Sequence, residues 1–325
     1  DLAQSAFEGC VNLTSVKLSS DTTAIGTKAF KDCTGLTSFT IPNKVTLIRQ
    51  QAFDGCKNIK TFNISKNVNE IGKNVFINCT NLKSINVDKN NKKYATVNGS
   101  LYNKKKNNLI AYPGGRTSSY KVSKGTEYIG NQSFSGATVK KVVLPNTVKN
   151  IGYKAFENCK NLNNITIPSS VSFIDAKAFD NTKYYNTSKY WYKGQLYVAN
   201  CVVDSKTNIK SANLKSGTRL IAKEAYYNRK NLKSVKLSNK LQYINDRAFL
   251  NCNKVKSAVL PKSIKYVGKK AIGYKITTVY ADVDSFLEYY QKMILARDDF
   301  TLYVYKNTAG NRYAKGNAFN YKVIK

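Results

Sequence analysis

The densest group of candidate binding residues is the segment YYNTSKYWYKGQLY, residues 184–197, which holds the single tryptophan of the chain. Tyrosine and tryptophan rings that face solvent are typical anchors of protein interfaces and stacking platforms for sugars. The candidate ligand-binding residues of this segment are Tyr190, Trp191, Tyr192 and Tyr197. The sequence leaves a second interpretation open, in which the rings cover the small core of the insertion that carries them.

The residue types that most enzymes use for catalysis are scarce. The chain has no histidine, which removes Ser-His and Cys-His dyads and imidazole metal ligands. Carboxylates are scattered, and the adjacent pair Asp298–Asp299 would point its side chains apart on a strand. The sequence contains no P-loop, no Gly-rich nucleotide fingerprint and no C-x-x-C pair. We therefore expect no catalytic residues, no metal and no cofactor, and predict that the protein is not an enzyme.

The chain is strongly basic, with 53 Lys+Arg against 19 Asp+Glu and a formal net charge of +34. Such a field attracts anionic glycans, anionic surfaces, acidic proteins or nucleic acid. Only seven of the basic residues are arginine, the residue that recognises phosphate and base edges with two parallel hydrogen bonds. The excess of lysine is therefore consistent either with an anionic partner or with biased amino-acid usage in the source.

An aromatic residue recurs at a fixed spacing. Phe7, Phe30, Phe53 and Phe76 follow one another in steps of 23 residues. The same slot returns at Phe134, Phe156, Phe179, Tyr226, Phe249 and Ile272. A fixed period between 20 and 50 residues indicates a solenoid, in which each unit packs only against its neighbours.

Each unit contains the same local signals. A short alternating segment such as LTSVKL, residues 13–18, predicts a strand with one buried face. A proline after the strand ends the pairing, an apolar pair follows, and a glycine fits a tight corner. The segment "KAF" with the cysteine after it is typical of one short helical turn whose Ala, Phe and Cys face inward. Stacking such units about 4.8 Å apart buries faces that a single unit cannot bury.

Six cysteines share one slot of the repeat, and Cys201 lies outside it. The six are Cys10, Cys33, Cys56, Cys79, Cys159 and Cys252. Stacked neighbours would have Cα atoms about 5 Å apart, which is within disulfide range. Because the side chains would point in parallel toward the core, we predict a ladder of free thiols that behave as small hydrophobic groups.

The outward positions of the predicted sheet form a small, polar face that could bind an extended partner or simply face water. Its candidate binding residues are Ser38, Thr40, Thr61 and Asn63, and further outward positions are Ser15, Lys17, Ser84, Asn86, Asn164, Thr166, Ser234 and Lys236. A column of lysines runs beside this face, with Lys60, Lys83, Lys140, Lys233 and Lys256. Because like charges on adjacent strands repel, these side chains either spread into water or bind an anionic partner.

Two insertions interrupt the period, at about residues 88–128 and 183–220. NGSLYN, residues 98–103, is similar to KGQLYV, residues 193–198, so the insertions are related to each other, and the first is typical of a β-hairpin. After residue 280 the repeat decays. Phe286, Tyr290, Met293 and Arg297 have helical spacing and follow a Ser285/Glu288 capping pattern, which predicts a helix. FTLYVYK then predicts a strand, and residues 281–325 are expected to form a C-terminal α/β cap or the start of the next module.

The pattern L-x-x-[IVF]-x-[IL]-P followed by V-x-x-I-G-x-x-A-F-x-x-C resembles the BspA-like subclass of leucine-rich repeats over residues 2–280. The resemblance implies a leucine-rich-repeat solenoid over residues 1–280, with short helical turns and a curved, concave parallel sheet. It also implies secreted or surface proteins of bacteria and parasitic protists, several of which are adhesins for host matrix proteins.

We therefore expect an extracellular or cell-surface adhesion protein that binds a host matrix protein or another surface protein. The alternatives are a scaffold module that binds anionic cell-wall polysaccharide and, least favoured, a nucleic-acid-binding protein. No stretch of 18 apolar residues predicts a transmembrane segment. The chain begins inside a repeat, so we expect a fragment from which any targeting segment is absent.

Overall fold

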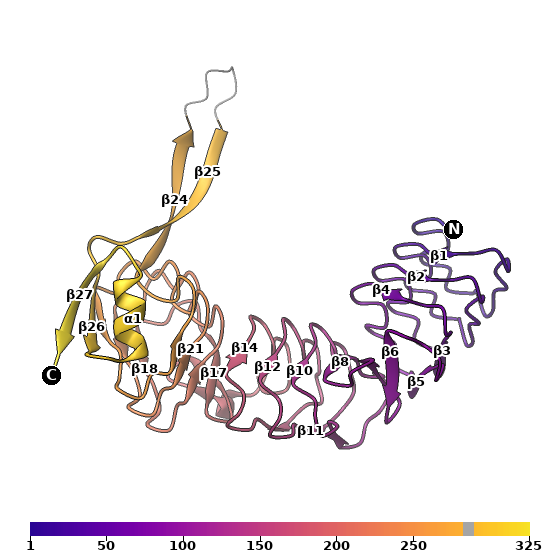
Figure 1. Cartoon of the computed structure of the whole chain (residues 1–325), viewed down its shortest axis with the longest axis horizontal. Coiled ribbons are helices and arrows are strands. Elements are labelled where there is room, and N and C mark those ends of the chain that lie inside the picture. The colour runs from indigo at the N-terminus through magenta and orange to yellow at the C-terminus, as the bar shows by residue number, and fades with distance from the viewer. Residues whose placement is uncertain (282–288) are drawn as a thin grey trace. The chain divides into compact units, whose positions relative to one another are not determined.

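The computed structural model describes residues 1–281 and 289–325 and divides the chain into two compact units. The first unit contains residues 1–171 and 177–187, and the second contains residues 172–176 and 188–325. In each unit the chain coils repeatedly and contributes one or two short parallel strands per coil (Figure 1). The predicted leucine-rich-repeat solenoid is thus confirmed.

The first unit builds its parallel ladders from strands of two to four residues. Successive coils pair in the orders β1-β2-β4, β3-β5, β9-β11-β13 and β8-β10-β12. The strands of the first two ladders are β1 (Ala24–Ile25), β2 (Leu47–Ile48), β4 (Glu70–Ile71), β3 (Thr61–Ile64) and β5 (Ser84–Val87). Those of the other two are β9 (Tyr120–Lys121), β11 (Lys141–Val143), β13 (Asn164–Thr166), β8 (Asn108–Ala111), β10 (Tyr128–Ile129) and β12 (Asn150–Ile151).

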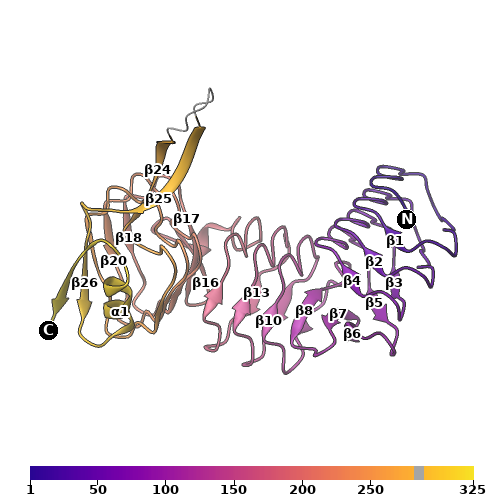
Figure 2. The ribbon, with the colours of Figure 1, turned by 45° about the horizontal axis from the view of Figure 1, so that its top comes forward.

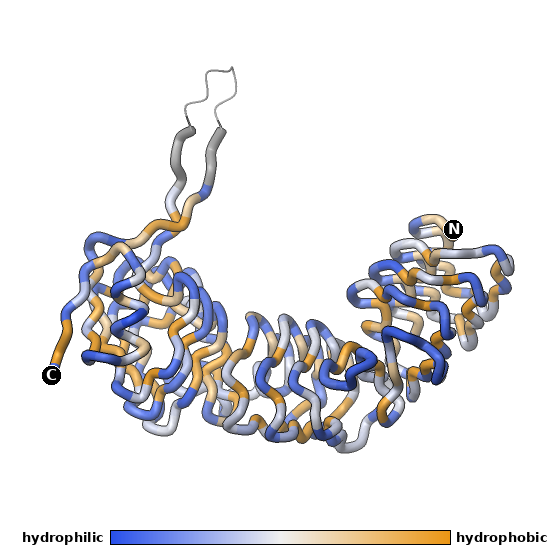
Figure 3. The backbone as a smooth tube through the Cα atoms, in the orientation of Figure 1, coloured by the Kyte–Doolittle hydropathy of each residue, from blue (hydrophilic) through white to orange (hydrophobic). Residues whose placement is uncertain are grey.

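The pairing register places like residues on like residues. Ile25 is paired with Ile48, and Ile48 with Ile71, so one isoleucine of each coil lies directly over the next. Because only neighbouring coils cover these side chains, the core is a set of apolar columns that runs along the stack. Hydrophobic and hydrophilic stretches accordingly alternate within each coil (Figure 3).

Phenylalanine rings form the most regular of these columns. Phe7, Phe30 and Phe53 stack with ring centroids 5.2 and 5.3 Å apart. Phe134, Phe156 and Phe179 continue in the same way with centroids 4.8 and 5.3 Å apart. The slot predicted from the period therefore holds rings of successive coils in contact.

The expected helical turn of each coil is a pair of consecutive reverse turns. Ala29 N–H donates to Gly26 O and Lys31 N–H donates to Lys28 O, and Lys28 and Asp32 have positive φ. This alternation directs the N–H groups of alternate residues toward the next coil. Lys28, Phe30 and Asp32 donate to carbonyl oxygens of the next coil at 2.8–3.0 Å. The turns thus form a backbone ladder of their own.

The first insertion is a three-stranded antiparallel meander whose last strand enters the parallel ladder. Its strands are β6 (Tyr94–Val97), β7 (Ser100–Asn103) and β8, and β8 pairs with β10. Asn98 and Gly99 join β6 to β7, and both have positive φ, as a type I′ hairpin turn requires. Figure 2 shows β6, β7, β8 and β10 in this order.

The second unit repeats this plan. Its meander consists of β15 (Trp191–Tyr192), β16 (Gln195–Val198) and β17 (Cys201–Ser205), and the ladder continues as β17-β19-β21-β23. Lys193 and Gly194 form the equivalent turn with positive φ. The other elements are β14 (Phe173–Ile174), the 3-10 helix η1 (Ser188–Tyr190), β19 (Leu220–Ile221), β21 (Tyr243–Ile244), β23 (Tyr266–Val267), β18 (Ser211–Asn213), β20 (Ser234–Lys236) and β22 (Ser257–Val259).

The predicted helix near the C-terminus is wrong for the residues that the structure describes there. Tyr290 and Met293 lie in strand β25 (Tyr289–Ala296), which pairs antiparallel with β24 (Tyr274–Ala281) over eight residues, and Arg297 follows that strand. Ser285, Phe286 and Glu288 lie outside the described residues. Pairing with β24 thus determines the extended conformation of these residues, although their spacing is also compatible with a helix.

The segment after these strands closes the second unit. The predicted strand is confirmed as β26 (Thr301–Tyr305), which lies between β22 and β27 (Asn320–Ile324) in a parallel sheet. Helix α1 (Ala309–Lys315) connects β26 to β27, and Thr308 Oγ1 caps it by accepting from Asn311 N–H at 3.2 Å.

Candidate functional site

The second meander carries three half-buried rings, each with at least one exposed lysine beside it. We call this group the aromatic–lysine surface; its residues are Tyr190, Trp191, Tyr192, Lys189, Lys193, Lys206 and Lys215. The distances from ammonium nitrogen to ring centroid are 5.0 Å for Lys189 and Tyr190, 4.2 Å for Lys206 and Trp191, 5.4 Å for Lys193 and Tyr192, and 5.0 Å for Lys215 and Tyr192. Each distance is within the range of a cation–π contact.

Strand pairing and a buried amide fix the position of this surface. Trp191 and Tyr192 pair with Leu196 and Gln195 across the type I′ turn. The Gln195 side chain is fully buried, accepts from the Tyr226 hydroxyl and donates to Asn213 O at 3.0 Å. The meander is therefore attached to the coils beneath it, so the rings project from a fixed support.

Two aromatic residues of the segment 184–197, the predicted binding residue Tyr197 and Tyr184 at the start of the segment, lie in cores instead. Tyr197 is 4 % exposed; its hydroxyl accepts from Lys215 N–H at 3.0 Å and bonds Thr218 Oγ1 at 3.2 Å, and burial raises the pKa of this hydroxyl. Tyr184 is buried in the first unit, where its hydroxyl accepts from Ile165 N–H at 2.9 Å. The aromatic segment therefore combines core residues with residues that remain accessible to a ligand.

The predicted polar sheet face is present in the first unit. Ser38, Thr40, Thr61 and Asn63 are exposed, and Thr40 and Asn63 form an isolated parallel bridge. Asn86 Nδ2 donates to Asn63 Oδ1 at 3.0 Å, so the amides of neighbouring strands bond to each other. Thr40, Asn63 and Asn86 line a shallow depression of about 340 Å³ that could accept hydrogen bonds from an extended partner.

The lysine column includes ammonium groups with very different surroundings. Lys83 donates to Gly115 O, and Lys256 pairs with Asp299 at 2.6 Å, where Arg297 and Lys256 hold the pKa of the carboxyl well below its usual range. The ammonium groups of Lys60 and Lys233 are exposed and have no hydrogen-bond partner among residues 1–281 and 289–325. The column is therefore not a uniform row of free charges.

The cysteine slot is a structural ladder. All seven cysteines lie in the described part of the chain and are free, and Cys10 alone is exposed. Cys33, Cys56 and Cys79 donate from Sγ to the carbonyl of the phenylalanine one coil earlier, at 2.9, 3.0 and 3.1 Å. Burial raises the pKa of Cys33 to about 11 and of Cys79 to about 12, so these thiols remain protonated and unreactive at neutral pH.

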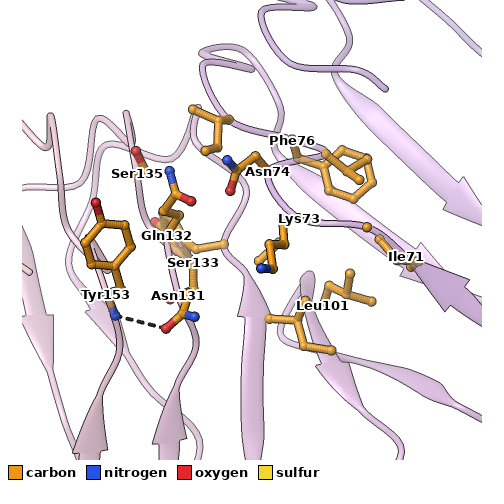
Figure 4. Close-up of a pocket in the computed structure, with 16 residues that line it drawn as sticks. Ile71, Lys73, Asn74, Phe76, Leu101, Asn131, Gln132, Ser133, Ser135 and Tyr153 are labelled. Atoms are coloured by element: carbon orange, nitrogen blue, oxygen red, sulfur yellow. Dashed lines mark hydrogen bonds between the residues drawn. The ribbon is translucent and has the colours of Figure 1, made fainter. Parts of the chain in front are cut away.

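A pocket of about 310 Å³ in the first unit was not predicted from the sequence. It lies where the first meander joins the coils, between the turns of residues 72–77 and 131–135 (Figure 4). Leu101, Ile110 and Tyr112 contribute to its lining. We call it the ladder pocket. The available signal was the segment LIAYPGG, which keeps an aromatic residue in the repeated slot but lacks the rest of the turn.

Within residues 1–281 and 289–325, no three His, Cys, Asp or Glu side chains are grouped so that they could hold a metal ion. Across the same residues, no helix has the length and apolar character needed to cross a membrane.

Comparison with known proteins agrees with this architecture. In the crystal structure of the pneumococcal vaccine antigen PcpA, 68% of that chain aligns with 96% of this one, at 22% identity and a TM-score of 0.51. A leucine-rich repeat protein from Eubacterium ventriosum matches at 22% identity and 0.43 over 83% of this chain and 79% of that one. A leucine rich cell surface protein from Faecalibacterium prausnitzii matches at 21% identity and 0.39 over 82% and 76%. No curated protein matches the chain significantly.

The family is shown by a model rather than by any one relative. The model described as a BspA type leucine rich repeat region, in six copies, matches residues 1–111, 110–201 and 196–279. These ranges include nearly all of the coils and both meanders. The chain therefore belongs to the BspA-type leucine-rich repeat family.

Proposed function

We propose that this protein is a non-catalytic, extracellular or cell-surface adhesion protein that binds a macromolecule through the aromatic–lysine surface. The observation that carries the proposal is the contact of each half-buried ring with an ammonium group at 4.2–5.4 Å, on a meander anchored by Gln195. Rigid aromatic residues with adjacent cations are typical anchors of protein interfaces.

The proposed partner is a protein of the host matrix or of another surface. A protein can present acidic side chains to the lysines and an apolar group to Trp191 at the same time, which uses both components of the surface. The polar sheet face of the first unit, with Thr40 and Asn63, would add hydrogen bonds to an extended segment. A fold neighbour described as a pneumococcal vaccine antigen supports exposure to the outside of the cell.

Anionic cell-wall polysaccharide is the alternative partner, favoured by the net charge of +34. The two partners differ in salt dependence. For a ligand held mainly by lysines, the logarithm of the affinity falls steeply and linearly with the logarithm of the salt concentration. A ligand held mainly by the aromatic rings keeps most of its affinity. Nucleic acid would show the same steep loss and is disfavoured by the small number of arginines.

The test is an array of matrix proteins and anionic glycans probed with the intact chain at two salt concentrations. We expect a matrix protein to be retained at both concentrations and its signal to fall with Trp191→Ala. A signal confined to glycans at low salt, and unchanged by Trp191→Ala, would replace the proposal with the polysaccharide scaffold. Binding to neither class, with the chain folded, would refute both.

A further inference from the structure

The ladder pocket lies where one coil of the first unit lacks a complete turn. In four turns of this unit, three alternate N–H groups donate to three carbonyl oxygens of the next turn. In the coil before the pocket these bonds run from Gln51 to Lys73 at 2.9 Å, from Phe53 to Val75 at 3.2 Å and from Gly55 to Ile77 at 2.9 Å. The regular pattern therefore requires a next turn to accept from residues 74, 76 and 78.

The meander supplies only the centre of that next turn. The Tyr112 ring stacks on Phe134 with centroids 4.7 Å apart, and Tyr112 N–H donates to Ser133 O at 2.7 Å. Pro113 has no N–H, and the N–H of Gly114 donates to no residue in 1–281 or 289–325. The segment around Tyr112 thus contributes one aromatic ring and one hydrogen bond to the turn that follows it. An ordinary coil contributes one ring and three hydrogen bonds.

Backbone groups on both walls of the pocket are left without partners. On one wall the N–H groups of Asn74 and Phe76 donate no hydrogen bond to any residue in 1–281 or 289–325. On the other wall the carbonyl oxygens of Asn131 and Ser135 accept none from the same residues. All four residues line the pocket (Figure 4).

A buried hydroxyl provides an independent indication of a ligand. Ser133 lines the pocket, is 3 % exposed, and its Oγ has no hydrogen-bond partner among the described residues. The corresponding positions of neighbouring turns are Ala29, Ala52 and Ala155, which have no such group. A buried unpaired hydroxyl is costly, and native structures rarely keep one without a partner that binds there.

We propose that the ladder pocket binds a short peptide segment of a partner protein, whose backbone completes the hydrogen-bond ladder between the two turns. A peptide group presents both a carbonyl oxygen and an N–H, which suits a pocket lined by unpaired donors and unpaired acceptors. Completion of a ladder by a peptide is an established mode of recognition at sheet edges.

The apolar lining favours a peptide that carries an apolar side chain. Leu101 and Tyr112 are buried, and Ile110 is half-buried beside them. An alkyl or small aromatic side chain would cover these groups while the backbone bonds to the walls. This site lies in the first unit and does not depend on the aromatic–lysine surface in the second.

A displayed library of random heptapeptides, selected on the intact chain, tests the proposal. Ser135→Trp would block the pocket, and Glu157→Trp is the matched control in the same slot of the next turn. We expect the selected peptides to lose at least tenfold in affinity with Ser135→Trp and to be unaffected by Glu157→Trp and Trp191→Ala. Gln132→Trp, with Lys154→Trp as its control, serves if Ser135→Trp does not fold.

Backbone recognition is then tested on the best peptide. N-methylation of one peptide nitrogen should weaken binding at least fivefold, and hydrogen exchange of the Asn74 and Phe76 amides should slow on binding, with Gln51 unchanged. No enrichment over the blocked chain, equal binding to the Ser135→Trp variant, or unchanged exchange at Asn74 and Phe76 would overturn the proposal. Slowed exchange with chitotriose but with no peptide would assign the pocket to an acetamido sugar and also overturn it.

Discussion

Phe156→Ala should be among the most destabilising single substitutions in the first unit. The ring is fully buried and stacks on Phe134 and Phe179 with centroids 4.8 and 5.3 Å apart. Truncation of a buried phenylalanine costs about 3–5 kcal/mol, and each lost stacking pair adds about 0.5–1.5 kcal/mol to burial alone. With two such pairs we expect a loss of about 4–5 kcal/mol in the free energy of unfolding.

Urea unfolding followed by circular dichroism measures this loss, and Phe7→Ala provides the comparison. Phe7 is half-buried and stacks on Phe30 alone, so the same truncation should cost about 1–2 kcal/mol. Hydrogen exchange should also increase first in the coils next to residue 156, because each coil depends on its neighbours. Equal losses for Phe156→Ala and Phe7→Ala, or a loss below about 2 kcal/mol for Phe156→Ala, would refute the column of rings as the source of stability.

Three further predictions concern charge and thiols. Lys206→Gln should lower the slope of log affinity against log salt by about one for a polyanionic ligand and change it little for a ligand held by Trp191, as measured by titration at several salt concentrations. Iodoacetamide at pH 8 should modify Cys10 and leave the other thiols unmodified until the chain unfolds, as mass spectrometry would show. Since burial raises the pKa of Cys79 to about 12, its contribution to stability is complete below the unfolded thiol pKa of about 8.5 and is lost as the pH rises toward 12. Cys79→Ala should therefore reduce the fall in Tm between about pH 9 and 11, and an unchanged fall would contradict the buried neutral thiol.

The repeated slots were predictable because a solenoid uses the same local contact in every coil. The position of Phe30 over Phe53, at 5.3 Å, follows from the period of 23 residues alone. The outward direction of Thr40 and Asn63 likewise follows from alternation along a strand. These features need no information from distant parts of the chain.

The wrong and missing predictions concern features that depend on contacts between segments far apart in the sequence. The residues of β25 have a spacing that fits a helix, and only the partner strand β24 selects the extended form. The ladder pocket exists because the segment after Tyr112 does not form a complete turn next to the turn of residues 72–77. No single sequence motif indicates this gap. Tyr197 could not be distinguished from Trp191 by type, because alternate residues of a meander face opposite sides.

The most direct test of the proposed function is the affinity of one array-selected matrix protein for the intact chain and for two tyrosine or tryptophan variants at physiological salt. Trp191→Ala removes the ring that lies 4.2 Å from Lys206, whereas Tyr128→Ala removes a more exposed ring in the first unit. We predict at least a tenfold loss of affinity for Trp191→Ala and less than a twofold change for Tyr128→Ala. Equal affinities for the two variants would contradict the account.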